Sequence, residues 1–378
     1  MRPTKIIFFL FLVMSTLEWQ CVDKYTSPYQ SPATGYLVVE GYITGNGPTR
    51  FTLSRTIPLP GSSAIPMETG AKVQVEGSDN SVYPLAEQNA GVYIIDTLAL
   101  NTATQYRLRI STTDGQVYLS GYTPYQPTPP IDSINWVYGS SGVTIYANTH
   151  DPTRSKGYYQ WTYTETWEYV SAYETQYIWD TATNSVIPRT ESQIVSTCWQ
   201  TDSSTSIILG STAKLSQNLI FDQPIQTIAA GSVQLGVEYS IIVRQYALTD
   251  SAYNFLALMA QNTESLGTIF DPQPSELTGN IKCLTTPSQP VVGWVSAGTL
   301  QQQRIFITRS QVPGWSYNNS CPIPTRLVPP DSTDFYFATF QWIPLDALTQ
   351  GHYPAAAAIC VDCTLQGGIT TKPSFWPN

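Results

Sequence analysis

Few residues in this 378-residue chain have the types and spacing that catalysis requires. Hydrolytic and transfer reactions usually use a histidine, paired carboxylates or a metal ion. The chain has two histidines: His150, which is followed by a turn-forming Asp-Pro pair, and His352, which follows a glycine. It contains no Gly-x-Ser-x-Gly elbow and no His-Glu-x-x-His motif. We therefore expect a binding protein, with a Ser-His-Asp hydrolase as the less favoured alternative.

Two carboxylates, Glu165 and Glu168, lie three positions apart in an aromatic segment. On a strand they would point to opposite faces, so they are poorly placed to share a proton. Glu165 has the same parity as the surrounding rings, and a buried carboxylate there would need a ring hydroxyl, an arginine or water as donor. Glu165 is therefore either a structural anchor or a ligand contact at a polar spot in an aromatic cleft.

Aromatic side chains occupy alternate positions of this segment and so share one face of a strand. They are Tyr159, Trp161, Tyr163, Trp167, Tyr169, Tyr173, Tyr177 and Trp179. We predict that Tyr158–Val170 is one strand, with its rings in a core and a mostly polar reverse face in water. Beyond Ser171 the pattern weakens near a turn. We therefore expect Tyr173, Tyr177 and Trp179 to be exposed and to contact a ligand or partner.

A proline-containing segment, Phe270–Asn280, reads as a loop between the predicted helix and the next strand. Its two acidic residues, Asp271 and Glu276, do not supply the alternating oxygen ligands of a calcium loop. Loops of this kind often carry recognition, so Asp271 and Gln273 are candidate contacts for a ligand or partner. We predict no metal site and no cofactor.

The first residues have the order of an export signal, with basic Arg2 and Lys5 before an apolar run at Ile6–Met14. This run is too short to span a bilayer as a helix, which needs about 20 residues. We predict a signal peptide at 1–20, lipidation of Cys21 and a tether at 21–34. The residues before Cys21 depart from the usual small ones, so ordinary cleavage with a spare thiol is the alternative.

Five further cysteines follow, and in an exported chain they are expected to form disulfides. They allow at most two bridges and one free thiol, in arrangements that the sequence leaves open. The CxxC spacing near the C-terminus also occurs in redox and zinc sites, but no second CxxC and no nearby histidine accompany it. The five candidates for structural disulfides are Cys198, Cys283, Cys321, Cys360 and Cys363.

The charge and composition of the chain limit the classes of partner that it can bind. The chain has 18 basic and 27 acidic residues, and without residues 1–20 it has 16 and 26, a net charge of −10. An acidic chain is a poor partner for nucleic acid or for anionic lipid. Only 12% of the residues are charged, while neutral polar residues abound. This composition favours an extracellular β-protein.

Short strand patterns separated by turn signals dominate the chain after the tether. At 35–123 we predict an immunoglobulin-like β-sandwich, followed by a proline-rich linker at 124–132. At 133–378 we predict a larger β-rich domain with one short helix, Ser251–Thr263, in which apolar residues recur at helical spacing. The predicted strands of the sandwich are Tyr36–Ile43, Arg50–Ser54, Ala71–Glu76, Gly91–Asp96, Gln105–Ser111 and Gln116–Ser120. Those beyond it include Tyr239–Leu248, Arg304–Thr308 and Asp334–Ile343.

Several stretches of the chain match a known family in order and spacing. They read CVDKY, YLVVEGYIT, YYQWTYTETWEY, FDPQPSELTGNIKCL and CVDC…GG…KPSFW. With them the chain resembles an uncharacterised family of Bacteroidetes outer-membrane lipoproteins, domain of unknown function 4249. The resemblance implies a two-part β-protein encoded beside a TonB-dependent outer-membrane receptor. It implies no activity and no catalytic residues.

Together these observations predict an outer-membrane lipoprotein, lipid-anchored at the cell surface. We expect it to capture a ligand such as a glycan or peptide as the accessory partner of a TonB-dependent transporter. The alternative is a structural or adhesive surface protein without a transported ligand.

Overall fold

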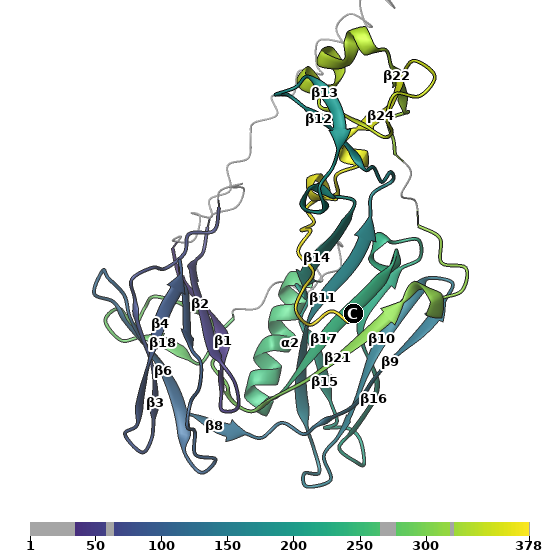
Figure 1. Cartoon of the computed structure of the whole chain (residues 1–378). Helices are drawn as coiled ribbons and strands as arrows, with labels where there is room; N and C mark the ends of the chain where they lie inside the picture. The colour runs from purple at the N-terminus through teal and green to yellow at the C-terminus, as the bar shows by residue number, and fades with distance from the viewer. Residues whose placement is uncertain (1–34, 58–63, 265–276, 318–320, 378) are drawn as a thin grey trace, which may run out of the picture.

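The structure, a computed structural model, describes residues 35–57, 64–264, 277–317 and 321–377. Figure 1 shows two β-sandwiches side by side and a smaller unit above the second one. Strands make up most of the regular structure, which confirms the predicted mainly β fold.

Among the described residues, no helix has the length and apolar character needed to cross a bilayer.

The first sandwich begins at the start of the described chain, and its antiparallel strands follow one another closely in sequence. β4 links its two faces, because its first half pairs with β3 and its second half with β5. β8 also pairs with β6, which closes the series of strands. The strands are β1 (Leu37–Thr44), β2 (Thr49–Arg55), β3 (Lys72–Gly77), β4 (Val82–Asn89), β5 (Val92–Ile95), β6 (Gln105–Ser111), β7 (Val117–Ser120) and β8 (Thr123–Gln126).

Three short strands from much later in the chain complete this sandwich: β18 (Ile281–Cys283), β19 (Val291–Gly293) and β20 (Ala297–Gly298). β18 pairs antiparallel with β7, while β19 and β20 run parallel to β1. From the sequence, these residues are predicted to belong to the C-terminal domain at 133–378. They pair with the first sandwich because β1 and β7 would otherwise expose unpaired backbone groups at sheet edges.

The second sandwich packs two sheets face to face. One sheet has the order β16-β10-β9, and the other has the order β14-β11-β17-β21 with β15 also beside β11. Its core is built from both inner faces and includes Ile145, Trp161 and Ile241, each fully buried. The strands are β9 (Ile131–Gly139), β10 (Gly142–His150), β11 (Tyr158–Val170), β14 (Thr197–Ser203), β15 (Ile208–Ser211), β16 (Leu219–Ala229), β17 (Glu238–Ala247) and β21 (Leu300–Thr308).

The aromatic segment forms the predicted single strand, β11, and its odd-numbered side chains face the core. Tyr159, Trp161 and Tyr169 are at most 3% exposed, which confirms that these rings pack in a core. The reverse face, expected to lie in water, is partly covered. The Tyr158 ring lies 5.1 Å from the ring of Tyr253.

The helix α2 (Asp250–Glu264) lies between the two sandwiches (Figure 1). Tyr253 faces β11, and the Phe255 ring lies 5.5 Å from the ring of Trp294, which follows β19. The predicted helix therefore forms, and its aromatic side chains pack against both sandwiches.

A smaller unit, which we call the cap, lies beyond the upper end of β11 and β14 (Figure 1). Its small core contains Val328, Phe337 and Ala355. The predicted strand Asp334–Ile343 is wrong, because residues 334–339 form a π-helical turn and only the end of the range is strand. A short apolar run fits either state. The cap strands are β12 (Tyr177–Asp180), β13 (Ser185–Pro188), β22 (Arg326–Val328), β23 (Trp342–Pro344) and β24 (Tyr353–Ala357).

Single turns of helix join these elements. They are η1 (Glu191–Gln193), η2 (Val233–Leu235), η3 (Arg309–Gln311), η4 (Pro330–Ser332), η5 (Asp334–Thr339), η6 (Ala358–Cys360) and η7 (Cys363–Gln366).

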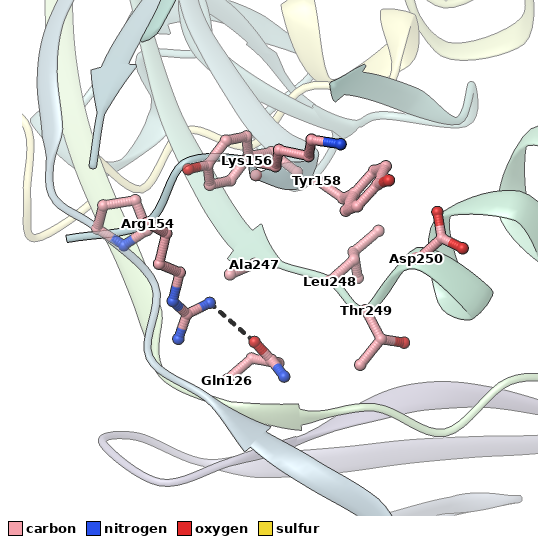
Figure 2. Close-up of a pocket in the computed structure, with 11 residues that line it drawn as sticks. Gln126, Arg154, Lys156, Tyr158, Ala247, Leu248, Thr249 and Asp250 are labelled. Atoms are coloured by element: carbon pink, nitrogen blue, oxygen red, sulfur yellow. Dashed lines mark hydrogen bonds between the residues drawn. The ribbon is translucent and has the colours of Figure 1, made fainter. Parts of the chain in front are cut away.

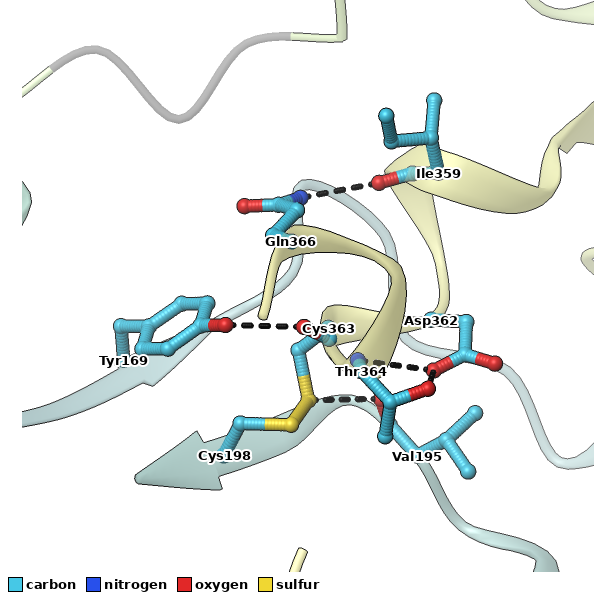
Figure 3. Close-up of a disulfide and its surroundings, with 8 residues drawn as sticks. All are labelled: Tyr169, Val195, Cys198, Ile359, Asp362, Cys363, Thr364 and Gln366. Carbon is cyan, nitrogen blue, oxygen red and sulfur yellow. Dashed lines mark hydrogen bonds between the residues drawn. A yellow bond between two sulfur atoms is a disulfide. The ribbon is translucent and has the colours of Figure 1, made fainter. Parts of the chain in front are cut away.

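Two disulfides form among the described residues, Cys198–Cys363 and Cys321–Cys360. The first joins β14 to the C-terminal segment, and the Tyr169 hydroxyl donates to the Cys363 carbonyl beside it at 2.8 Å (Figure 3). The expectation that Cys283 is a disulfide candidate is wrong. Its thiol is free and buried in the core of the first sandwich, whereas the four bonded cysteines belong to the second sandwich and the cap.

Candidate ligand-binding site

A cavity of about 310 Å³, which we call the junction cavity, lies where the two sandwiches and the start of α2 meet (Figure 2). Three segments line it: the end of β8 with the linker after it, the β10–β11 loop with the start of β11, and the end of β17 through the first residue of α2. The lining residues are Gln126, Pro129, Arg154, Lys156, Gly157, Tyr158, Tyr159, Ala247, Leu248, Thr249 and Asp250.

The loop that carries the basic residues is held in place by its glycine. A Cβ atom on Gly157 would lie 2.4 Å from the Tyr159 hydroxyl and 2.5 Å from the Asn218 amide oxygen, so only glycine fits here. The Gly157 N–H donates to the Thr212 hydroxyl at 2.8 Å. The loop enters β11 in a fixed direction as a result.

Arg154 is the cation on one side of the cavity. Its Nη1 donates to the Gln126 amide oxygen at 2.8 Å, a contact that joins the second sandwich to the first. Its Nε lies 3.8 Å from Asp151, a loose ion pair. Lys156 is exposed, and no carboxylate of the described residues lies within ion-pair distance of it.

Asp250 is the anion on the other side, as Figure 2 shows. It lies in the first turn of α2, where the helix dipole stabilises negative charge. The Asn254 amide donates to it at 3.3 Å. The neighbouring Tyr158 hydroxyl also interacts with this carboxylate, which is the main cause of the raised pKa of Tyr158. None of the described basic residues forms an ion pair with Asp250.

The base of the cavity is apolar. Ala247 and Leu248 are 3% and 5% exposed, and the Tyr158 ring stands beside them (Figure 2). Charges of both signs thus surround an apolar floor, an arrangement that suits a small charged ligand with some apolar surface. Within the described ranges, no group of three or more His, Cys, Asp and Glu is placed to hold a metal ion.

The three rings expected at an exposed tip are instead half-buried in and beside the cap. Trp179 packs against Phe337, with ring centroids 5.5 Å apart. The backbone N–H of Tyr173 donates to the Cys360 carbonyl, and Tyr177 lies in the β12–β13 hairpin. The expectation of exposure is therefore wrong, because strands from more than a hundred residues downstream cover this hairpin.

Glu165 lies in the core of the second sandwich, with 3% of its surface exposed. It accepts hydrogen bonds from the Tyr239 hydroxyl at 2.6 Å, from Gln234 at 2.8 Å and from Gln226 at 3.3 Å. Burial raises its pKa, and the bonds from Tyr239 and the glutamines oppose that shift. A ring hydroxyl thus meets the carboxylate, one of the three expected donors, and Glu165 does not line the junction cavity.

The two histidines are not brought together. His150 is the last residue of β10, and its Nδ1 lies 2.7 Å from an oxygen of Asp132. His352 lies in a turn before β24, 3.3 Å from the Gln350 carbonyl. Cys21, Asp271 and Gln273 lie outside the described residues.

The residues of the junction cavity were not singled out from the sequence as a site. Arg154 and Lys156 stand close together just before the aromatic strand in a chain poor in basic residues, and that was the available signal. Asp250 directly precedes the predicted helix Ser251–Thr263, and the sequence by itself does not relate it to Arg154. Its place opposite Arg154 depends on the packing of segments about a hundred residues apart.

Comparison with protein families finds a match to the family described as "Domain of unknown function (DUF4249)", over residues 22–304. No curated protein matches the chain. A solved structure of the chicken interferon gamma receptor alpha chain is 11% identical, with 58% of this chain and 91% of that chain covered and a TM-score of 0.15. The FN1–FN3 domains of chicken CNTN1 are 13% identical, with 57% and 63% covered and a TM-score of 0.17. Scores this low establish no shared fold.

Proposed function

The chain belongs to the DUF4249 family, and on that premise we propose that it is an outer-membrane lipoprotein that captures a small ligand in the junction cavity. It acts as the accessory partner of a TonB-dependent transporter in the same membrane. The observation that carries this proposal is the junction cavity itself, where Arg154 and Asp250 lie on opposite sides of Ala247 and Leu248 (Figure 2).

The N-terminal sequence supports the anchoring part of the proposal. Arg2, Lys5 and the apolar run Ile6–Met14 precede Cys21 in the order of a lipoprotein export signal. Acyl chains on Cys21 hold a protein in the membrane, since each buried CH₂ contributes about 0.8 kcal/mol. Confinement to the membrane plane raises the effective concentration of the protein near a membrane partner.

The anchoring part is tested with Cys21→Ser in the native host. We expect wild-type protein in the membrane fraction with the added mass of acyl chains, and the variant in the soluble fraction without that mass. The matched control is Cys283→Ser, which removes a free thiol far along the chain. Equal membrane retention of the Cys21 variant without acyl mass would refute lipid anchoring.

The capture part is tested by native purification and mass spectrometry of retained small molecules. Lys156→Trp places a bulky ring at the rim of the cavity, and Lys214→Trp makes the same change at an exposed residue that does not line it. We expect the wild type and the Lys214 variant to retain the same compound and the Lys156 variant to retain at least about tenfold less. Equal retention by both variants, or none by the wild type, contradicts capture at this cavity.

A further inference from the structure

We infer that the ligand of the junction cavity is a short peptide of two or three residues. Its carboxylate is bound at Arg154 and its ammonium group at Asp250. This inference rests on the proposed function, because it names the class of ligand that the same cavity captures.

The accessibility of the Arg154 guanidinium indicates where the carboxylate of the ligand binds. Its side chain is 37% exposed, so it is accessible, and the bond to Gln126 fixes its direction. Guanidinium is a planar group with five N–H donors, which matches a carboxylate in two parallel hydrogen bonds. Asp151 holds one edge only loosely at 3.8 Å, so donors remain for a ligand. Lys156 at the rim adds a second positive charge on this loop.

The Asp250 carboxylate, which has no ion-pair partner among the described residues, indicates where the ammonium group of the ligand binds. An ionised carboxylate accepts about four hydrogen bonds, and Asn254 and the Tyr158 hydroxyl are the neighbours that occupy part of this capacity. No described basic residue neutralises it. An ammonium group of a ligand would supply both the missing donors and the missing charge.

The width of the cavity sets the length of the ligand. A cavity of this volume is about 8 Å across if it is taken as a sphere, and an extended chain spans about 3.3–3.6 Å per residue. The termini of a single amino acid lie much closer together than this width, so one amino acid is too short to reach both sides of the cavity. Two or three residues span the cavity.

The floor of the cavity sets the character of the peptide. Ala247 and Leu248 are buried and apolar, and they offer no charged or hydroxyl partner to a side chain. The Tyr158 ring adds further apolar surface beside them (Figure 2). Small apolar side chains therefore fit better than charged ones.

The first experiment is calorimetric titration of the full mature chain with trialanine, N-acetyl-trialanine and trialanine amide. We expect trialanine to bind and each blocked peptide to bind at least about tenfold more weakly, because each lacks one charge-assisted contact. Equal affinity of the three peptides, or no binding of trialanine, overturns the inference.

Variants then assign each end to its residue. Asp250→Asn should weaken the binding of trialanine but leave the affinity for N-acetyl-trialanine unchanged. Arg154→Gln should weaken the binding of trialanine but leave the affinity for trialanine amide unchanged. Asp96→Asn and Arg50→Gln are the matched controls, since both residues are exposed on the first sandwich. Thermal melting verifies that each variant is folded. Loss of both blocked and free peptide binding in a folded variant contradicts the assignment.

The two proposals can fail separately. If trialanine does not bind but the wild type retains a non-peptide compound that Lys156→Trp releases, capture stands and the peptide class is wrong. If the wild type retains nothing and trialanine does not bind, both are wrong.

Discussion

Glu165 shows how a buried charge is accommodated at the scale of one residue. The carboxylate lies between two sheets, and its described hydrogen-bond donors, Tyr239, Gln226 and Gln234, are all neutral. Burial without a cation raises its pKa, because the charged form loses its hydration. Burial and the adjacent carboxylate also raise the pKa of the Tyr239 phenol.

The first prediction concerns the pH dependence of this residue. Because its folded-state pKa is raised, the stabilisation from its protonated form is fully present below the unfolded pKa, near 4.5, and is lost as the pH rises through the folded pKa. Wild-type protein should therefore lose stability relative to Glu165→Gln as the pH rises above about 4.5. Urea unfolding at several pH values measures this difference.

The control is Glu174→Gln, a change at an exposed carboxylate. Its stability relative to the wild type should stay constant over the same pH range. A constant difference for Glu165→Gln as well would show that burial does not disfavour the charged form.

At the scale of elements, the C-terminal segment is attached to the second sandwich at several points. The Cys198–Cys363 bridge fixes it to β14, and Trp199 and Ile369 exchange backbone hydrogen bonds of 2.8 and 2.9 Å. Further along, the Trp376 indole donates to Glu168 at 3.2 Å on the outer face of β11. The reverse face of the aromatic strand is therefore covered by the chain itself.

The two disulfides should differ in how much they stabilise the protein. They close loops with sequence separations of 165 and 39 residues, and the entropy of loop closure predicts a difference of about 1 kcal/mol in favour of the longer loop. The double variant Cys198→Ala, Cys363→Ala should therefore be less stable than Cys321→Ala, Cys360→Ala. Urea unfolding of the two variants measures the order, and the reverse order would contradict the prediction.

At the scale of the whole molecule, the two sandwiches are joined by more than a linker. The Tyr42 hydroxyl donates to the Ala247 carbonyl at 3.2 Å, and its ring lies 4.9 Å from that of Tyr246. Asn46 exchanges two hydrogen bonds of 2.8 Å with the backbone of Leu300. The junction cavity lies beside these contacts, so its two sides are held in a defined relation.

The interleaved topology predicts that residues 35–130 do not fold alone. This fragment lacks the buried side chains of Ile281, Val291 and Val295, each of which contributes about 1.5–3 kcal/mol when fully buried. Their sum, roughly 5 kcal/mol or more, is comparable with the total stability of a domain, about 5–15 kcal/mol. The fragment also lacks β18, β19 and β20, the strands that pair with β7 and β1 in the full chain.

Thermal unfolding followed by circular dichroism tests this prediction on the isolated fragment. We expect no cooperative transition, whereas the same residues within the full chain unfold cooperatively. A cooperative transition of the fragment at the temperature of the full chain would show that β18, β19 and β20 are dispensable.

Local features of this protein were determined by its sequence alone. The mainly β fold, the single strand at Tyr158–Val170, the burial of its rings and the upper limit of two bridges follow from alternation, hydrophobicity and cysteine number. Each depends on neighbours within one element or on simple counting. The membrane anchor at Cys21 stays a prediction, since this residue lies outside the described structure.

Only the tertiary structure decided which distant segments meet. It selected the cysteine pairs, placed Trp179 against Phe337 of the cap and brought Gln126, Arg154 and Asp250 around one cavity. Strand periodicity states which face of a segment is buried but not which segment covers it. Contacts over such separations depend on the packing of whole sheets, and the candidate site consists entirely of contacts of this kind.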